Sequence, residues 1–289
     1  MTIATIDIGG TGIKFASLTP DGKILDKAST ATPETLEELL AWLDQRLSER
    51  DYRGIAMSVP GAVHQETGVI EGISAIPYIH GFSWYEALAH HKLPIHLEND
   101  ANCVGLSELL AHPEIENAAC VVIGTGIGGA MIINGKLHRG RHGLGGEFGY
   151  MTTIEPAEKL NNWSQLASTG NMVRYVIEKS GQSDWDGRKV YQEAAAGNAL
   201  CQEAIERMNR NLAQGLLNIQ YLIDPDVISL GGSISQNPDF IKGVQKAVDA
   251  FVETYEEYTI APVIQACTYQ ADANLYGALV NWLQEEKQW

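Results

Sequence analysis

The sequence has few cysteines, no long apolar run and little positive charge. Its four cysteines, at positions 103, 120, 201 and 267, stand far apart without a C-x-x-C pair. This spacing excludes a disulfide framework and a zinc–thiolate cluster, and it favours reduced thiols in a cytoplasm. No apolar stretch approaches the roughly 20 residues that a membrane helix needs. The N-terminus also lacks the basic flank and cleavage site of a signal peptide, so we expect a cytoplasmic protein with no membrane segment.

Basic residues are outnumbered, with 20 lysines and arginines against 36 aspartates and glutamates, giving a net charge of −16. A field of that sign repels nucleic acid, and no basic patch interrupts it. It repels nucleotides as well, so a phosphate site would depend on backbone N–H groups and a metal cation. With 289 residues, 45% of them hydrophobic and 19% charged, the chain is globular and suits one large or two mid-sized domains.

The tetrapeptide Gly-Thr-Gly-Ile occurs twice, at Gly10–Ile13 and at Gly124–Ile127. Each copy lies between two apolar runs, and each second run ends at Asp-Gly or Asn-Gly followed by a lysine. Such dipeptides between apolar runs predict hairpins, and the internal repeat predicts two related lobes. Glycine lets N–H groups approach a ligand, and threonine adds a donor. Two such turns could bind a polyphosphate, although either copy alone could be an ordinary tight hairpin.

The second copy, read as Gly124–Gly129, also fits the G-x-G-x-x-G fingerprint of dinucleotide-binding proteins. That fingerprint requires a helix directly after the glycines. The residues from Ala130 to Gly135 instead indicate a short strand that ends in a turn. This context argues against a nicotinamide or flavin site.

Apolar periodicity and turn residues predict alternating strands and helices, which is typical of an α/β fold. Strands are expected at residues 2–8, 12–18, 23–31, 54–59, 95–98, 118–133 (as a hairpin), 227–230 and 263–266. Helices are expected at residues 34–50, 84–91, 101–111, 163–179, 186–196, 199–223, after 238, and at 272–286. Thr32-Pro33 reads as the start of the first long helix. The segment 62–83 is loop-rich and receives no assignment.

Several polar residues stand where strands end, which is where α/β proteins bind ligands. Asp7 lies beside the first glycine turn, and Asn99-Asp100 lies at a strand-to-helix turn, where N-capping of the helix is the alternative reading. Glu147 is the one carboxylate of the glycine-dense segment 140–149, where solvated surface is the alternative. Three loop histidines read as plain surface, at positions 64, 80 and 142.

Five motifs, taken in order, resemble the ROK family of sugar kinases nearly from end to end. They are Asp7–Lys14, Glu98–Asn102, Ile123–Gly129, Gly146–Tyr150 and Leu230–Ser233. The resemblance implies a two-lobed, actin-like ATPase (ribonuclease H-like) fold, with mixed sheets flanked by helices around a central cleft. It further implies an N-terminal lobe of residues 1–115 plus 271–289, for phosphate and sugar. A C-terminal lobe of residues 116–270 would serve nucleotide, sugar and dimerisation.

The resemblance also implies roles for the matching residues. Asp100 would be the general base that takes a proton from the 6-hydroxyl of a sugar, and Asp7 would act on Mg²⁺ through water. Contacts to the sugar would come from Gly61, Asn99, Asp100, Glu147 and Tyr150. ATP would be bound by Asp7, Gly9, Gly10, Thr11, Gly12, Lys14, Gly124, Thr125, Gly126, Gly128, Gly231 and Gly232. The expected ligands are a small sugar and ATP with Mg²⁺, and the expected assembly is a homodimer.

One departure from the family pattern concerns zinc. Tyr150 stands where the family usually has histidine, and the following segment, Met151–Ser168, contains no cysteine. The family's zinc knuckle therefore lacks its thiolate ligands, and we expect no structural zinc. The family glutamate after the cysteines is also missing, and Ser164 or Gln165 stands near its position.

The chain is most similar to the β-glucoside kinase branch of the family, whose members phosphorylate the 6-hydroxyl of the non-reducing glucose of cellobiose-like sugars. Loss of the knuckle could open one end of the cleft for such a longer sugar. A glucokinase or a mannose or N-acetylmannosamine kinase is the alternative. A non-catalytic sugar sensor is the rival of another class. Only six residues precede Asp7, so we expect no fused helix-turn-helix of the kind that repressor relatives carry.

Overall fold

The computed structural model describes residues 1–72, 74–154, 160–255 and 257–287. The chain divides into two compact units. The first comprises Met1–Glu114, Arg139–Gly145 and Ala271–Trp289, and the second comprises Ile115–His138 and Gly146–Gln270. Within the described ranges, no helix is long and apolar enough to cross a membrane.

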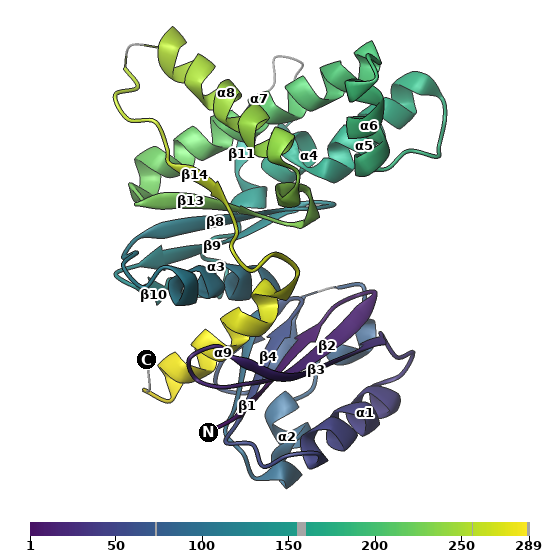
Figure 1. Cartoon of the computed structure of the whole chain (residues 1–289), viewed down its shortest axis with the longest axis vertical. Helices are drawn as coiled ribbons and strands as arrows, with labels where there is room; N and C mark the ends of the chain where they lie inside the picture. Colours follow the sequence, from purple (N-terminus) through teal and green to yellow (C-terminus); the bar gives the residue numbers. More distant parts are fainter. Residues whose placement is uncertain (73, 155–159, 256, 288–289) are drawn as a thin grey trace. The chain divides into compact units, whose positions relative to one another are not determined.

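The first unit is built on a five-stranded sheet with the order β3-β2-β1-β4-β7 (Figure 1). Its strands are β1 (Ile3–Ile8), β2 (Gly12–Leu18), β3 (Ile24–Ala31), β4 (Ile55–Val59) and β7 (Ile95–Asn99). The first three form an antiparallel meander, whereas β4 and β7 continue the sheet in parallel with β1. A small antiparallel hairpin, β5 (Ala62–His64) with β6 (Val69–Glu71), follows β4.

Helices cover both faces of this sheet. They are α1 (Leu36–Ser48), η1 (Pro77–Ile79), α2 (Trp84–Ala87), η2 (Ala89–His91), α3 (Asp100–Ala111) and α9 (Ala273–Glu285), which η5 (Gln270–Asp272) precedes. Ile6 of β1 belongs to one apolar cluster with Leu43 of α1. Ile3 of the same strand belongs to another cluster, with Trp282 of α9. Successive strand side chains point to opposite faces, so β1 is buried from both sides.

The second unit repeats this plan with the sheet order β10-β9-β8-β13-β14 (Figure 1). Its strands are β8 (Ala118–Ile123), β9 (Ile127–Ile133), β10 (Lys136–Leu137), β13 (Val227–Gly231) and β14 (Ile264–Ala266). Again three antiparallel strands are followed by two parallel ones. The duplicated strand–turn–strand pattern in the sequence therefore reflects two equivalent hairpins, β1–β2 and β8–β9.

Most of the remaining chain of the second unit is helical. Its elements are η3 (Phe148–Tyr150), β11 (Thr152–Ile154), β12 (Leu160–Asn162), α4 (Trp163–Ala167), α5 (Thr169–Ser180), α6 (Gly187–Ala195), α7 (Ala199–Ile223), η4 (Ser233–Gln236) and α8 (Pro238–Thr254). A single apolar cluster joins Val121 of β8, Leu216 of α7 and Val244 of α8. The predicted α/β fold with mixed sheets is confirmed.

Some predicted element boundaries were wrong; the helix expected over 84–91, for example, is divided into α2 and η2. Helix α1 begins after Thr35, whose hydroxyl accepts from the Glu38 N–H at 3.2 Å, and not at Thr32-Pro33. The hydroxyl of Thr32 instead donates to the Gly9 carbonyl at 2.6 Å. This hydrogen bond stabilises the first glycine turn. The helix expected over 163–179 is divided into α4 and α5, because Ser168 is extended and caps α5. The unassigned segment 62–83 holds β5, β6 and η1.

Candidate functional site

The first glycine turn joins β1 to β2. The Gly9 N–H donates to the Gly12 carbonyl at 3.1 Å, and a Cβ on Gly9 would lie 3.0 Å from the same oxygen. A side chain at Gly9 would therefore crowd the turn. Gly10 and Thr11, at the tip, are exposed, so their backbone groups are available to a ligand.

Asp7 lies opposite Lys14 in the hairpin and is buried, with 6% exposure. Its Oδ2 lies 3.1 Å from Lys14 Nζ, and its Oδ1 accepts from Asn274 Nδ2 at 2.9 Å. Lys14 also donates to the Ala271 carbonyl at 2.6 Å. The carboxylate is thus oriented beside the exposed turn. A carboxylate oxygen suits Mg²⁺, and a lysine suits phosphate, so these residues fit a magnesium-bound phosphate.

Asn99 is the last residue of β7 and the N-cap of α3. Its Oδ1 accepts from the N–H groups of Ala101 and Asn102 at 2.9 and 3.2 Å. Its Nδ2 donates to the Gly61 carbonyl at 3.1 Å, which joins two residues that the sequence assigned to the sugar. The capping alternative therefore holds for Asn99. Asp100 lies in the first turn of the helix, where its Oδ1 accepts the Ala101 N–H at 2.8 Å.

The electrostatics of Asp100 differ from those of an ordinary surface aspartate. Burial raises the pKa of its carboxyl above the usual 3.8, and the charge of Asp7 raises the pKa further. The N–H of Ala101 acts in the opposite direction because it bonds to the charged form. A carboxylate that is poorly solvated takes up a proton more readily, which is what a general base requires.

Glu98 directly precedes this pair and is 2% exposed. Its Oε1 accepts from the Asn99 N–H at 2.8 Å and from Asn102 Nδ2 at 2.9 Å, and its Oε2 accepts from Arg139 Nε at 2.6 Å. Glu98 therefore bonds to the last residue of β7, Asn99, and to Asn102 in the first turn of α3. Glu98 lies in a motif that assigns it no role, and no sequence motif pointed to Arg139 or Asn274. A carboxylate at the end of a buried strand was the available signal for Glu98.

The second glycine turn joins β8 to β9 and packs against the start of α5. The Gly124 N–H donates to the Gly126 carbonyl at 2.9 Å, and the Gly170 N–H donates to the Gly124 carbonyl at 3.1 Å. A Cβ on Gly170 would lie 2.5 Å from the Thr125 carbonyl, so this contact requires glycine. Gly124, Thr125 and Gly126 are exposed. The turn is followed by a strand, β9. A dinucleotide fingerprint requires a helix at this place, so the turn does not match it.

The third glycine junction lies directly beside the second turn. Gly231 ends β13 opposite Val122 of β8, and Gly128 of β9 also pairs with Val122. Gly232 has a φ of 89°, and a Cβ there would lie 2.1 Å from the Ile123 carbonyl. Both its conformation and its contact therefore demand glycine. The residues expected to bind adenosine and phosphate are thus neighbours within the second unit.

A cavity of about 510 Å³ adjoins this junction and was not foreseen from the sequence. Thr169 of α5, Tyr191 of α6 and Ser233 of η4 are among its lining residues. The hydroxyls of Thr169 and Tyr191 are buried without a hydrogen-bond partner among the described residues. Buried polar atoms are normally satisfied. A ligand with a polar edge, such as a nucleoside, would satisfy them.

Glu147 and Tyr150 belong to the second unit, in a loop packed on β9. A Cβ on Gly149 would lie 2.0 Å from the Ile127 carbonyl, so the loop backbone lies directly on the strand. Ser164, which stands near the missing family glutamate, accepts from the Ile127 N–H at 2.9 Å. Glu147 is partly buried, whereas Tyr150 is 71% exposed. The roles of both residues remain predictions.

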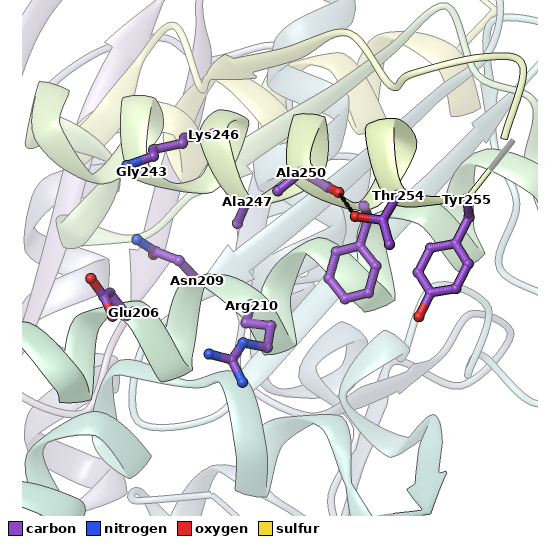
Figure 2. Close-up of a pocket in the computed structure, with 10 residues that line it drawn as sticks. Glu206, Asn209, Arg210, Gly243, Lys246, Ala247, Ala250, Thr254 and Tyr255 are labelled. Carbon is purple, nitrogen blue, oxygen red and sulfur yellow. Dashed lines mark hydrogen bonds between the residues drawn. The ribbon is translucent and has the colours of Figure 1, made fainter.

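Another cavity of about 530 Å³ lies between α7 and α8 (Figure 2). Asn209 and Arg210 line it from α7, and Lys246 and Ala250 line it from α8. None of the residues that the sequence assigned to ATP or sugar lines this cavity. We assign it no part in the chemistry.

Comparison with known proteins gives the family. Residues 3–285 match the ROK family. A β-glucoside kinase of Listeria monocytogenes is 34% identical over 99% of this chain and 99% of its own length. A β-glucoside kinase of Klebsiella pneumoniae is 31% identical over 98% and 97%. A ROK family protein from Streptococcus pneumoniae TIGR4 has been crystallised in complex with sucrose. Its sequence is 88% identical to this one over 100% of both chains, and the two structures superpose with a TM-score of 0.98. The chain therefore belongs to the ROK family and has its actin-like ATPase fold.

Proposed function

We propose that the protein is a β-glucoside kinase, which transfers the γ-phosphate of ATP to the 6-hydroxyl of the non-reducing glucose in a cellobiose- or gentiobiose-like sugar. That it is an ATP-dependent carbohydrate kinase follows from its family and relatives. One observation carries the catalytic assignment. Asp100, a carboxylate with a raised pKa, follows Asn99 at a junction that Glu98 and Gly61 hold in place.

In the proposed reaction the 6-hydroxyl oxygen attacks the γ-phosphorus. Its bond to phosphorus forms as the bond between the γ-phosphorus and the bridging oxygen breaks, and ADP leaves. Asp100 accepts the hydroxyl proton, which is worth on the order of 10²–10⁴-fold in rate. Asn99 and Gly61 bind neighbouring hydroxyls and orient the sugar. Alignment of this kind, together with charge neutralisation, supplies most of the catalysis in phosphoryl transfer.

In each unit, the exposed backbone groups of the glycine turn suit phosphate oxygens of the nucleotide. Asp7 would hold Mg²⁺ through water, and Lys14, beside it at 3.1 Å, would donate to a phosphate oxygen. Bound Mg²⁺ neutralises phosphate charge, which matters in a protein with a net charge of −16. The cavity beside Gly232 receives the adenosine. We expect no structural zinc in the segment after Tyr150, because it has no thiolate ligands.

A disaccharide acceptor is supported by the relatives and by the space in the first unit. Two relatives are named β-glucoside kinases, and the S. pneumoniae protein was crystallised with sucrose, a disaccharide. A cavity of about 480 Å³ lies next to Gly61, and the following residue, Ala62, is part of its lining. Polar side chains line it, among them Gln65, Glu71 and Arg141. Such a lining suits the hydroxyls of a second sugar ring.

The test is a coupled ADP-release assay with glucose, mannose, N-acetylmannosamine, cellobiose and gentiobiose as acceptors. We expect kcat/KM to be highest for the β-linked disaccharides. High turnover of glucose or N-acetylmannosamine with none of cellobiose would replace the β-glucoside assignment with the corresponding hexose kinase. Sugar binding without ADP release from any acceptor would indicate a sensor.

We also infer a homodimer, as the family resemblance implies, in the cytoplasm, as the separated cysteines suggest. Exposed apolar side chains of the second unit support an interface there, since Tyr221, Leu222, Ile260 and Val263 are each at least 49% exposed. Tyr221 of α7 contacts the segment before β14, because its hydroxyl accepts the Ile260 N–H at 3.3 Å. Light scattering should give twice the chain mass of 31.5 kDa, and Leu222→Glu should give a monomer. A monomeric wild type would exclude the dimer.

A further inference from the structure

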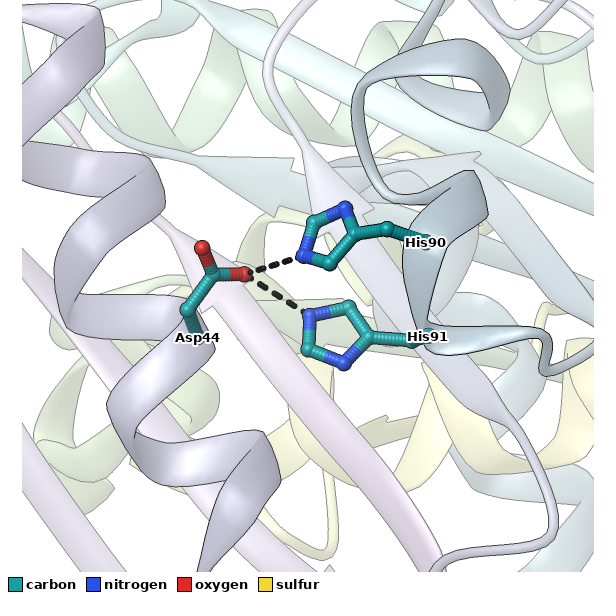
Figure 3. Close-up of side chains that lie close together, drawn as sticks. All are labelled: Asp44, His90 and His91. Carbon is teal, nitrogen blue, oxygen red and sulfur yellow. Dashed lines mark hydrogen bonds and ion pairs between the residues drawn. The ribbon is translucent and has the colours of Figure 1, made fainter.

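Three side chains with metal-ligand atoms meet on the first unit, and the proposed kinase chemistry uses none of them (Figure 3). Asp44 comes from α1, and His90 and His91 come from η2. Asp44 Oδ1 lies 3.0 Å from His90 Nε2 and 2.7 Å from His91 Nε2. All three ligand atoms lie within 4.8 Å of one another. The two imidazole nitrogens therefore face the same carboxylate oxygen.

The backbone beneath these side chains is fixed by packing. Leu43, next to Asp44, and Leu88, at the start of η2, are fully buried members of one apolar cluster. The His91 N–H donates to the Leu88 carbonyl at 3.1 Å. Lys92 then takes a left-handed conformation, with a φ of 55°, and turns the chain away. The Cα positions of the three residues are thus set without a metal, which favours tight binding.

We propose that Asp44, His90 and His91 bind one divalent transition-metal ion of the Zn²⁺ type. Two imidazole nitrogens and one carboxylate oxygen are ligands that Zn²⁺ takes, and three protein ligands leave a fourth position for water. Hard cations such as Mg²⁺ prefer all-oxygen sites. This cluster uses imidazole rather than thiolate, so it differs from the cysteine knuckle that the segment after Tyr150 lacks.

The two distances from Asp44 Oδ1 to the imidazole nitrogens need only a small adjustment, whereas the ligand atoms of the cluster as a whole lie within 4.8 Å of one another. Tetrahedral bonds of about 2.0–2.1 Å to the metal place ligand atoms about 3.3 Å apart, compared with 2.7 and 3.0 Å here. The side chains of Asp44 and His90 are 43% and 56% exposed, so they are free to open by a few tenths of an ångström. The same exposure lets an ion enter from solvent. The negative net charge of the protein also attracts cations.

The competing explanation is a plain hydrogen-bonded cluster, in which both Nε2–H groups donate to Asp44. Calorimetric titration of untagged, EDTA-dialysed protein with ZnCl₂ distinguishes the two. We expect one Zn²⁺ per chain. His90→Gln and His91→Gln should each weaken binding by at least about tenfold, since even outer-shell changes at metal sites cost that much. His112→Gln is the matched control, because His112 also faces a carboxylate, Glu114, at 3.5 Å.

The melting temperatures of the same variants distinguish an effect on folding from an effect on metal binding. In EDTA we expect both His→Gln variants to melt near the wild-type temperature, because their side chains lie outside the apolar cluster. Zn²⁺ should raise the melting temperature of the wild type and of His112→Gln only. Wild-type protein that binds no Zn²⁺, or variants that bind as tightly as wild type, would overturn the proposal. If a variant fails to fold, the absorption spectrum of Co²⁺-loaded wild type decides, and absence of a tetrahedral band counts against the site.

Discussion

Arg139 Nε lies 2.6 Å from Oε2 of Glu98, whose side chain is 2% exposed. Arg139 also donates through Nη2 to Asn281 Oδ1 at 2.7 Å and to Glu285 Oε1 at 3.1 Å. It therefore connects the end of β7 to α9. Since Glu98 also bonds to the Asn99 N–H, this arginine supports the position of Asp100 indirectly.

Arg139→Leu should destabilise the first unit, because it leaves the buried Glu98 carboxylate without its cation. Breaking such a pair costs about 3–5 kcal/mol, and we expect the lower end because Arg139 itself is 27% exposed. Urea unfolding measures the change. Arg139→Lys keeps the charge and should lose less. Equal stability of wild type and Arg139→Leu would mean that the N–H donors of Asn99 and Asn102 suffice to hold the Glu98 carboxylate.

Asp100→Asn should lower kcat by about 10²–10⁴-fold, because the amide cannot take the hydroxyl proton. The fold and ATP affinity should change little, since asparagine can still accept the Ala101 N–H. Steady-state ADP release and nucleotide titration measure both effects. Asp51→Asn, at an exposed position, is the control. Full turnover by Asp100→Asn would reduce Asp100 to a residue of the first helical turn.

The raised pKa of Asp100 predicts the pH dependence of activity and of stability. The base works as the carboxylate, so kcat/KM should fall at low pH with an apparent pKa above 3.8. The folded state holds this proton more tightly than the unfolded state, so the contribution of Asp100 to stability falls as pH rises through that range. Asp100→Asn should therefore gain stability relative to wild type as pH rises above 3.8. A stability difference that does not vary with pH would contradict the shift.

Gly170→Ala should raise the KM for ATP, because its Cβ would lie 2.5 Å from the Thr125 carbonyl and would displace the second glycine turn. Binding of the sugar alone should be affected less, because Gly61, Asn99 and Asp100 belong to the other compact unit. Gly181→Ala is the control. Its φ of 70° makes alanine strained there, yet nothing lies within 4 Å, so it should lose stability without changing the KM for ATP. Equal KM values in the two variants would count against a phosphate role for the turn.

Asp7→Asn should increase the Mg²⁺ concentration needed for half-maximal activity, since a neutral amide holds hydrated Mg²⁺ less well than a carboxylate. The loss should be partly recovered at high Mg²⁺. Titration of ADP release with MgCl₂ measures the change. Asp272→Asn serves for comparison, because Asp272 pairs with Lys27 at 2.5 Å and is not assigned to the metal. An unchanged Mg²⁺ dependence in Asp7→Asn would remove Asp7 from the metal site.

Much of this fold could be predicted because its signals are local. Helix α7 begins and ends at the expected residues, 199 and 223, since Asn198 caps it and a left-handed Asp224 ends it. The hairpin repeat was readable from the glycine turns, the apolar runs beside them and the Asp-Gly and Asn-Gly dipeptides. By contrast, the division between α4 and α5 depends on Ser168 acting as a cap, and apolar periodicity continues across that break.

The candidate site was predictable only in part, for a related reason. Asp7, Asn99 and Asp100 stand at strand ends, where position alone suggests function. Arg139 lies 41 residues from Glu98 and 146 from Glu285, so its role depends on tertiary contacts that no local pattern reveals. The same holds for Asn274, which reaches Asp7 across 267 residues.

Helix α9 has a consequence for how the chain is made. Ile3, Ala16, Leu18 and Ala56 pack in one apolar cluster with Leu279 and Trp282, yet these two residues are synthesised after the whole second unit. Until α9 is synthesised, this face of the first sheet has only part of its apolar cover, which includes Cys103 of α3. Meanwhile the second unit, continuous apart from Arg139–Gly145, is synthesised and can fold. Vectorial folding from the N-terminus is common for multidomain chains. In this chain the second unit can complete its apolar core before the first unit does.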